Sequence, residues 1–221
     1  MHNLPFRQVH LDFHTTEMIE RIAGDFSKKQ FQEMLKLGYV DSITVFSKCH
    51  HGWSYHPTHF GEMHPGLAID LLQNMIESAH EINVKTPVYL SAGFDERLAR
   101  LHPEWLFRQR DERLGGAVDF MQPGFHLLCF NSPYLDILAD QIREAIGTYD
   151  ADGVFLDIVG IRECYCQNCV RTLRKEGRDP RDPAVVRELA ERVYLNYIQK
   201  VNDTVRSIKP DTPIFHNSGH I

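Results

Sequence analysis

The sequence alternates short apolar runs with longer segments that are apolar on one side only. The short runs are rich in β-branched and aromatic residues, which is typical of buried strands, and they lie at residues 8–13, 42–46, 87–92, 153–158 and 213–216. The longer segments repeat apolar residues at helical spacing, and they lie at residues 28–37, 67–82, 132–148 and 183–208. This alternation predicts repeated βα units around a parallel sheet.

The number of predicted strands suggests part of a barrel. A closed (β/α)8 barrel takes about 250 residues, whereas this α/β chain has 221 residues and five predicted strands. We therefore expect residues 1–221 to form the first five βα units of a TIM-barrel-type catalytic domain that belongs to a longer enzyme. An open five-stranded sheet is the alternative. Residues 94–131 form a predicted insertion after the third strand, where barrel enzymes often place substrate-binding loops.

The composition of the chain argues against nucleic acid and membranes as partners. The chain is 43% hydrophobic and 24% charged, within the range of ordinary globular proteins, and its net charge of -6 offers no basic footprint for nucleic acid. No apolar stretch approaches the length of a membrane span, so no membrane partner is expected. The N-terminus lacks a signal-peptide pattern, which favours a cytoplasmic location.

Polar residues follow several of the predicted strands. In parallel α/β folds the active site lies beyond the carboxyl ends of the strands, so these residues are the candidates for substrate binding. They are His14, Lys48, His50, His51, Trp53, Tyr55, His216 and Asn217. Hydrogen-bond donors interleaved with aromatic faces suit sugars, which carry both hydroxyl groups and apolar faces. The alternative is a histidine-rich surface loop anchored by Trp53.

A carboxylate ends the fourth predicted strand. Asp157 follows the apolar run GVFL, and a retaining glycosidase needs such a carboxylate as its nucleophile, with an acid/base carboxyl about 5 Å away. Glu163, in the same loop, is the candidate acid/base, while Asp95 and Glu96 after the third strand are alternatives. An ordinary structural interpretation also exists, in which Asp157 caps the next helix.

Three of the five cysteines lie in the run CYCQNC. Cys164, Cys166 and Cys169 could bind a structural zinc ion if Cys49, Cys129 or a histidine supplied the fourth ligand. A redox pair and simple packing remain the alternatives.

The motifs SKCHHGWSYHPT, CFNSPY, DGVFLDIV and CYCQNC resemble the hypothetical glycosyl hydrolase 6 family, the N-terminal barrel domain of large bacterial enzymes similar to family 151 α-L-fucosidases. A weaker similarity links Lys48, His50, His51 and Trp53 to the motif KHHDGF of family 29 α-L-fucosidases. Here Cys49 intervenes, and His51 replaces the aspartate of that motif.

The resemblance implies retaining hydrolysis of terminal α-L-fucosides from oligosaccharides without a required cofactor. It makes His14, His50 and His51 sugar-binding residues and Asp157 the nucleophile. Glycosidases of this type often associate, so a homo-oligomer is also expected.

Three other functions stay open. A related barrel could act on β-galactosides. A metal-dependent barrel hydrolase could use a set of histidines and an aspartate as ligands, namely His10, Asp12, His14, His50, His51 and His216. A non-catalytic carbohydrate-binding module could use the same surface without turnover.

Overall fold

The computed structural model describes residues 5–114 and 124–218, and within them one sheet carries the fold. Its parallel strands are β1 (Gln8–His10), β2 (Ser42–Lys48), β5 (Pro87–Ser91), β6 (Gly153–Val159) and β7 (Ile214–Ser218). They lie in the order β1-β2-β5-β6-β7, and each neighbouring pair is parallel. The five predicted strands are thus confirmed, with ends that differ by a few residues, and their parallel order is that of a (β/α) barrel segment.

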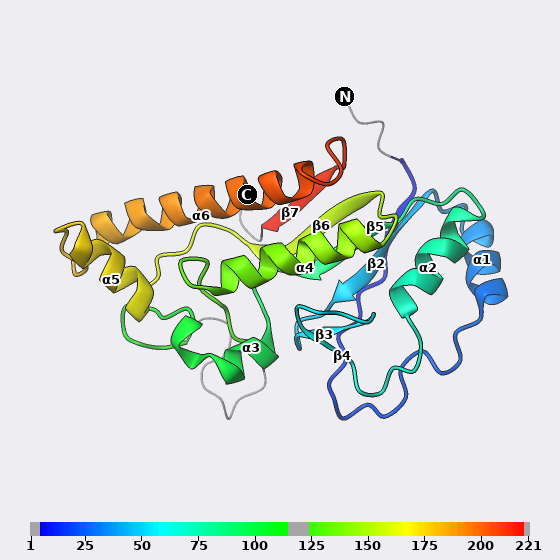
Figure 1. Cartoon of the computed structure of the whole chain (residues 1–221), viewed down its shortest axis with the longest axis horizontal. Coiled ribbons are helices and arrows are strands. Elements are labelled where there is room, and N and C mark those ends of the chain that lie inside the picture. The colour runs from blue at the N-terminus through cyan, green and yellow to red at the C-terminus, as the bar shows by residue number, and fades with distance from the viewer. Residues whose placement is uncertain (1–4, 115–123, 219–221) are drawn as a thin grey trace.

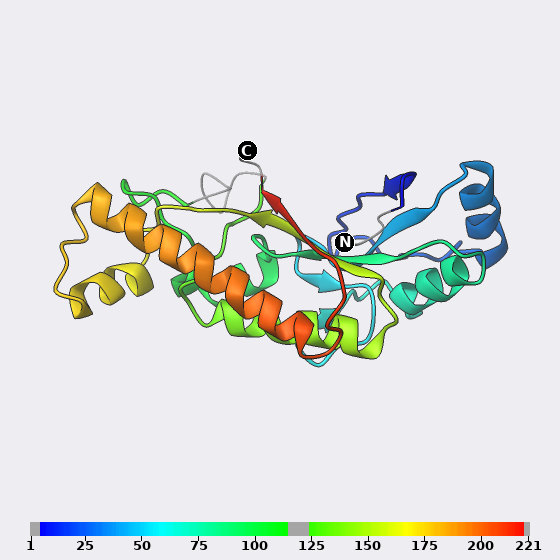
Figure 2. The same cartoon turned by 90° about the horizontal axis from the view of Figure 1, so that it is seen from above.

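Helices follow the strands as predicted. They are α1 (Lys28–Leu37), α2 (Leu71–His80), α4 (Tyr134–Thr148) and α6 (Pro183–Arg206). Figure 1 shows α4 and α6 side by side, and Figure 2, seen from above, shows that both cover the same face of the sheet. This covered face is called the helix side below, and the opposite face the inner side.

Side-chain caps explain where two of these helices begin. Asp70 accepts a hydrogen bond from Gln73 N, so α2 begins at Leu71 and not at residue 67 as the apolar spacing predicts. Asp182 accepts one from Ala184 N, and Pro183 supplies a first helical residue that needs no partner for its missing N–H. Local hydrogen bonding, which apolar spacing does not encode, therefore sets these boundaries.

Aromatic rings fill the inner side of the sheet. Phe46 on β2 stacks on Tyr89 on β5 at 3.9 Å between centroids, and Tyr89 stacks on Phe155 on β6 at 5.7 Å. His10 on β1 lies within 5.6 Å of the ring of each. Because side chains alternate along a strand, Asp157 lies on the same side as Phe155, one step nearer the carboxyl end.

The sequence did not predict five short elements. Two of them are strands that extend the sheet beyond β2, with β3 (Trp53–Ser54) antiparallel to β2 and β4 (Glu62–Met63) parallel to β3. The other three are α3 (Glu96–Leu101), the 3-10 helix Pro103–Trp105 and α5 (Gln167–Lys175). The predicted insertion at 94–131 holds α3 and isolated bridges such as Phe94 to Leu127, while its residues 115–123 lie outside the described residues. None of the helices in the described ranges has the length and apolar character needed to span a bilayer.

Candidate active site

Asp157 is held by three hydrogen-bond donors at the carboxyl end of β6. Tyr89 Oη donates to Asp157 Oδ2 at 2.6 Å, and Asn217 Nδ2 donates to Oδ1 at 2.7 Å. The backbone N–H of Ile158 also donates to Oδ1, at 2.9 Å. Burial, followed by the hydrogen bond to Asp157, raises the pKa of Tyr89, so its hydroxyl stays protonated and donates. The carboxylate is thus fixed in orientation while 8% of the residue surface remains exposed.

The backbone beside Asp157 depends on a glycine. The amides of Ala92 and Gly93 donate to the Asp157 carbonyl at 3.0 and 3.1 Å, and they close the β5–β6 ladder at its carboxyl end. A Cβ at position 93 would lie 2.0 Å from the carbonyl oxygen of Ile158. Ile158 itself has φ of 60°, a conformation that β-branched residues rarely adopt. Such strain is found at functional sites more often than elsewhere.

Two stacked histidines lie beside Asp157. The rings of His14 and His50 are 3.7 Å apart between centroids and nearly parallel, and His50 N donates to His14 Nδ1 at 3.1 Å. The Nε2 atom of His50 lies 3.8 Å from Asp157 Oδ2. Burial, followed by the nearby His14, lowers the pKa of His50 to about 3, and burial also lowers the pKa of His14. Both rings are therefore neutral near pH 7.

The hydrogen bonds of His50 fix which ring nitrogen carries its proton. Ser91 Oγ donates its single proton to the Phe94 carbonyl at 2.8 Å, so it can only accept from His50 Nδ1, which lies 2.7 Å away. In the neutral ring Nδ1 then carries the proton and Nε2 is an acceptor. Two acceptors, His50 Nε2 and the Asp157 carboxylate, thus face each other 3.8 Å apart, and a hydroxyl group could donate to either of them.

His51, Trp53 and Tyr55 follow β2 but play different parts. His51 is half-buried, its ring makes an edge contact with Phe125 at 4.8 Å, and burial lowers its pKa. Trp53 is buried with its Nε1 3.3 Å from Glu17 Oε2 and its ring under the Arg97 guanidinium. Tyr55 is fully buried and its hydroxyl lies 2.7 Å from Thr15 Oγ1. The histidine segment is therefore anchored to the core at Trp53 and Tyr55.

Lys48 points away from Asp157. A β-bulge at Ser47 inserts one extra residue into β2 between Phe46, which pairs with Tyr89, and Lys48, which pairs with Leu90. Lys48 therefore lies on the helix side of the sheet, opposite to Phe46. Its Nζ lies 2.9 Å from Asp95 Oδ2 and 3.3 Å from Tyr134 Oη on the helix side, and both charged groups are 1% exposed. The structure does not bring Lys48 to the predicted sugar site.

The two predicted sugar-binding residues on β7, His216 and Asn217, lie on opposite faces of the sheet. Asn217 binds Asp157, whereas His216 lies on the helix side with its Nδ1 3.0 Å from the hydroxyl of Tyr197 on α6. Adjacent residues of a strand point to opposite faces, so only one of the two can reach the site.

Glu163, the predicted acid/base, lies in the loop after β6 and is 39% exposed. Its Oε1 lies 3.5 Å from Arg187 Nη1 on α6, and Arg187 also lies close to Glu191. The structure therefore pairs Glu163 with α6 and not with the Asp157 group.

Helix α3 supports the histidine segment, a role that sequence reasoning missed. The backbone amides of Glu96 and Arg97 donate to the carbonyls of His50 and His51 at 3.1 and 3.3 Å. Asp95 caps the helix by accepting from Leu98 N. Gly52 makes room for this carboxylate, since a Cβ there would lie 2.3 Å from Asp95 Oδ1. Only six residues long, α3 carries too little periodic pattern to be predicted.

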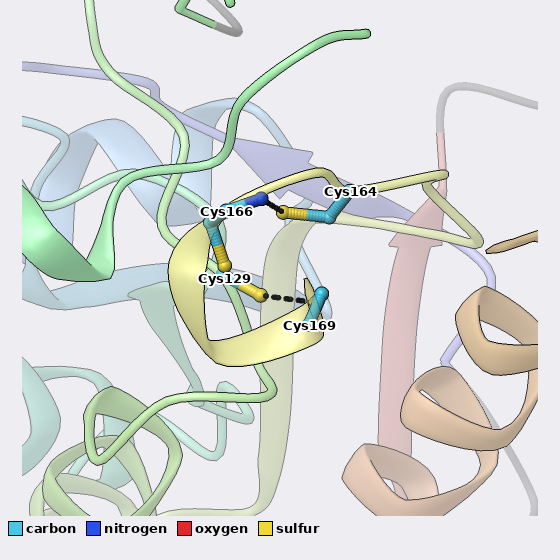
Figure 3. A group of neighbouring side chains, drawn as sticks. All are labelled: Cys129, Cys164, Cys166 and Cys169. Atoms are coloured by element: carbon cyan, nitrogen blue, oxygen red, sulfur yellow. Dashed lines mark hydrogen bonds between the residues drawn. The ribbon is translucent and has the colours of Figure 1, made fainter. Parts of the chain in front are cut away.

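Histidines do not gather as a metal-dependent hydrolase would require. His216 lies on the helix side, and the ring of His10 lies among Phe46, Tyr89 and Phe155. In the part of the chain that the structure describes, the one group of three or more His, Cys, Asp or Glu side chains close enough to hold a metal ion consists of cysteines. These are Cys129, Cys164, Cys166 and Cys169 (Figure 3).

The family of the chain follows from comparison with known proteins. The family described as hypothetical glycosyl hydrolase 6 matches residues 27–158, which is more than half of the chain. The chain belongs to this family. A search of curated proteins gives no match.

Solved structures agree with this assignment. The α-L-fucosidase isoenzyme 2 from Paenibacillus thiaminolyticus is 51% identical over 99% of this chain, with a TM-score of 0.97. The match covers 33% of that fucosidase, so this chain spans about a third of its length.

Two more distant structures share the fold. They are a β-galactosidase from Bacillus circulans sp. alkalophilus (15% identity, TM-score 0.64, 96% of this chain and 36% of that one) and the α-L-fucosidase AlfC from Lactobacillus casei (16% identity, TM-score 0.52, 86% and 50%). The prediction of a TIM-barrel-type fold, represented here by part of a barrel, is confirmed.

Proposed function

We propose that the protein containing this chain is a retaining α-L-fucosidase with Asp157 as its nucleophile. The observation that carries the proposal is the placement of Asp157, which stands at the carboxyl end of β6 with its carboxylate fixed by Tyr89 and Asn217. The 51% identity to an α-L-fucosidase supports the choice of sugar. Retaining glycosidases need an oriented carboxylate of this kind to form a covalent intermediate.

The reaction proceeds in two displacements. Asp157 attacks the anomeric carbon, a bond forms between its oxygen and that carbon, and the glycosidic bond breaks as the leaving oxygen takes a proton from the acid/base group. Water then attacks the same carbon, gives its proton to the acid/base group and releases Asp157 as a carboxylate. Tyr89 and Asn217 keep the attacking carboxylate from rotating, which lowers the entropic cost of reaching the transition state.

Neutral histidines suit the binding of sugar hydroxyls. His50 Nε2 is an acceptor 3.8 Å from the carboxylate, so a hydroxyl that donates to it would hold the sugar ring against Asp157. A neutral ring also avoids an ion pair with Asp157, which would weaken the nucleophile. The stacked His14 fixes the plane of His50. The oligosaccharide is thus recognised through its hydroxyl groups at the carboxyl ends of β2 and β6.

The test is hydrolysis of a panel of aryl glycosides by the full-length protein, with α-L-fucoside and β-D-galactoside included. We expect release of aryl alcohol from the fucoside, loss of at least about 1000-fold in kcat for Asp157→Gly, and rescue by azide with formation of a fucosyl azide. The control Asp150→Ala changes an exposed carboxylate that precedes β6 and should keep full activity. Turnover of the β-galactoside alone would favour the β-galactosidase alternative, and unchanged activity of Asp157→Gly would overturn the proposal.

The acid/base role of Glu163 is tested by leaving-group dependence. Loss of a general acid harms substrates with poor leaving groups more than activated aryl substrates. Because Glu163 contacts Arg187 on α6, it must turn toward Asp157 to act as the acid/base, and Glu163→Gln will then slow an unactivated fucoside more than a nitrophenyl fucoside. Equal rates for the variant and the parent on both substrates would show that another carboxyl is the acid/base.

A further inference from the structure

Four cysteines from distant parts of the chain meet beside the carboxyl end of β6. Cys129 precedes α4, Cys164 and Cys166 lie in the loop after β6, and Cys169 lies in the first turn of α5. Figure 3 shows that their side chains turn toward one another, and all four sulfur atoms lie within 4.8 Å of one another. All four residues are buried. The sequence run CYCQNC alone offers three of them, and the fold adds Cys129.

The spacing of the sulfur atoms fits thiolates around one ion better than a disulfide. Cys129 Sγ lies 3.5 Å from Cys169 Sγ, far beyond the roughly 2.05 Å of an S–S bond. Zinc–sulfur bonds of about 2.3 Å in a tetrahedron place the sulfur atoms roughly 3.8 Å apart. All four thiols are free in the structure.

Hydrogen-bond donors point at three of the sulfur atoms. Asn131 N lies 3.4 Å from Cys129 Sγ, Cys166 N lies 3.5 Å from Cys164 Sγ, and Asn131 Nδ2 lies 3.6 Å from Cys169 Sγ. Cys166 is also the N-cap of α5, so the cluster lies at the N-terminal end of this helix, where the helix dipole favours negative charge. Such donors stabilise thiolates and are the usual outer partners of metal-bound sulfur.

Apolar side chains enclose the cluster. The cysteines form a small core of their own with Leu173, Val186 and Leu189 from α5 and α6, separate from the main core of the sheet. Four protein ligands fill a tetrahedral site and leave no open position for water, which is the arrangement of structural zinc sites and not of catalytic ones.

We propose that Cys129, Cys164, Cys166 and Cys169 bind one Zn²⁺ as a closed structural site. The ion joins the end of the 94–131 insertion to the loop after β6, which begins a few residues beyond Asp157. It also anchors α5, which packs against α6. The site therefore holds in place the wall of the barrel mouth next to the candidate nucleophile, and this role is independent of which sugar the protein binds.

The first experiment measures metal content by mass spectrometry in the full-length protein, purified under reducing conditions. We expect one zinc per chain in the parent and in Cys49→Ser. Cys49 is the matched control, because it is buried but lies apart from the cluster, with its sulfur near the Thr15 carbonyl. Cys129→Ser and Cys169→Ser should lose most of the zinc. A parent with no zinc that takes none up, or with iron in its place, would overturn the proposal.

A second measurement uses only the parent protein, so it does not depend on whether the cysteine variants fold. The parent is stripped of metal with a chelator and titrated with Co²⁺, which reports four thiolate ligands through intense visible bands and charge transfer in the near ultraviolet. Saturation at one Co²⁺ per chain, with a rise in Tm, is the expected result. A cluster that yields no thiolate bands, or a Cys129–Cys169 disulfide in the unreduced protein, would show that the thiols serve packing or redox chemistry.

Discussion

The hydroxyl of Tyr89 on β5 donates a 2.6 Å hydrogen bond to Asp157 Oδ2 on β6. Tyr89 pairs with Phe155, so it reaches the carboxylate two residues further along the neighbouring strand. A hydrogen bond to a charged group contributes about 1.5–3 kcal/mol. We therefore expect Tyr89→Phe to lower kcat on an aryl fucoside by roughly 10- to 150-fold with a smaller change in KM.

The control for this variant is Tyr149→Phe. Tyr149 is also buried and also donates to a carboxylate, Asp70 Oδ2 at 2.7 Å, but it joins the end of α4 to the start of α2. Its loss should reduce Tm without a selective loss of kcat. Equal kcat values for Tyr89→Phe and the parent would mean that Tyr89 serves packing alone.

The buried histidines predict how stability depends on pH. The pKa of His50 is about 3 in the folded chain and about 6.5 in the unfolded chain, so the unfolded chain binds more protons between these values. Stability is therefore full above about pH 6.5 and falls as the pH is lowered toward 3. Burial lowers the pKa of His14, His51 and His56 as well, which acts in the same direction.

Thermal unfolding at several pH values measures this effect. We expect Tm to fall between pH 7 and pH 5. His50→Gln should reduce the slope of the free energy of unfolding against pH by up to about 1.4 kcal/mol per pH unit. His59→Gln, which changes an exposed histidine, should leave the slope as it is. A Tm that is as high at pH 5 as at pH 7 would contradict the neutral state of these rings.

The buried pair of Lys48 and Asp95 predicts a large loss of stability when one partner is removed. Both side chains are 1% exposed, and an unpaired buried charge costs about 3–5 kcal/mol. We expect Lys48→Met to lower the free energy of unfolding by that amount and Lys48→Met with Asp95→Asn to lower it less than the sum of the single changes. Asparagine retains a side-chain oxygen that can still cap α3.

The comparison for that pair is Lys29→Met. Lys29 Nζ lies 3.8 Å from Glu33 Oε1 on the exposed surface of α1. Exposed ion pairs of this kind contribute about 0–1 kcal/mol to the free energy of unfolding. Denaturant unfolding of the parent and the four variants, Lys48→Met, Asp95→Asn, the double variant and Lys29→Met, gives the free energies. A Lys48→Met variant as stable as Lys29→Met would mean that the buried pair contributes no more than a surface one.

Apolar periodicity predicted the long helices and parallel strands because those elements bury a continuous face. Helix α1 has the expected bounds, and every predicted strand exists. Helix α5 was missed because most of its residues are polar and only two of them, Cys169 and Leu173, are buried. The two-residue strands β3 and β4 are too short to show alternation.

The site was predicted in part, for reasons that individual residues make clear. Asp157, His14 and His50 meet because the carboxyl ends of parallel strands share one edge. Tyr89 was missed because an aromatic residue inside an apolar run resembles a residue of the hydrophobic core. It lies two residues before Ser91, which pairs with Asp157, so both Tyr89 and Ser91 lie on the face of Asp157. Whether the predicted sugar contacts form stays a prediction.

The extra residue in β2 sets the phase of the segment that follows it. If the same sequence paired with β5 without this bulge, Lys48 would lie on the face of Phe46, so its ammonium would turn toward the aromatic rings of the inner side and leave Asp95 without a counter-ion. Because α3 holds the His50 and His51 carbonyls, the disturbance would pass into the 94–131 insertion. The register of β2 against β5 and the position of α3 are therefore linked, because both depend on the segment from Lys48 to His51.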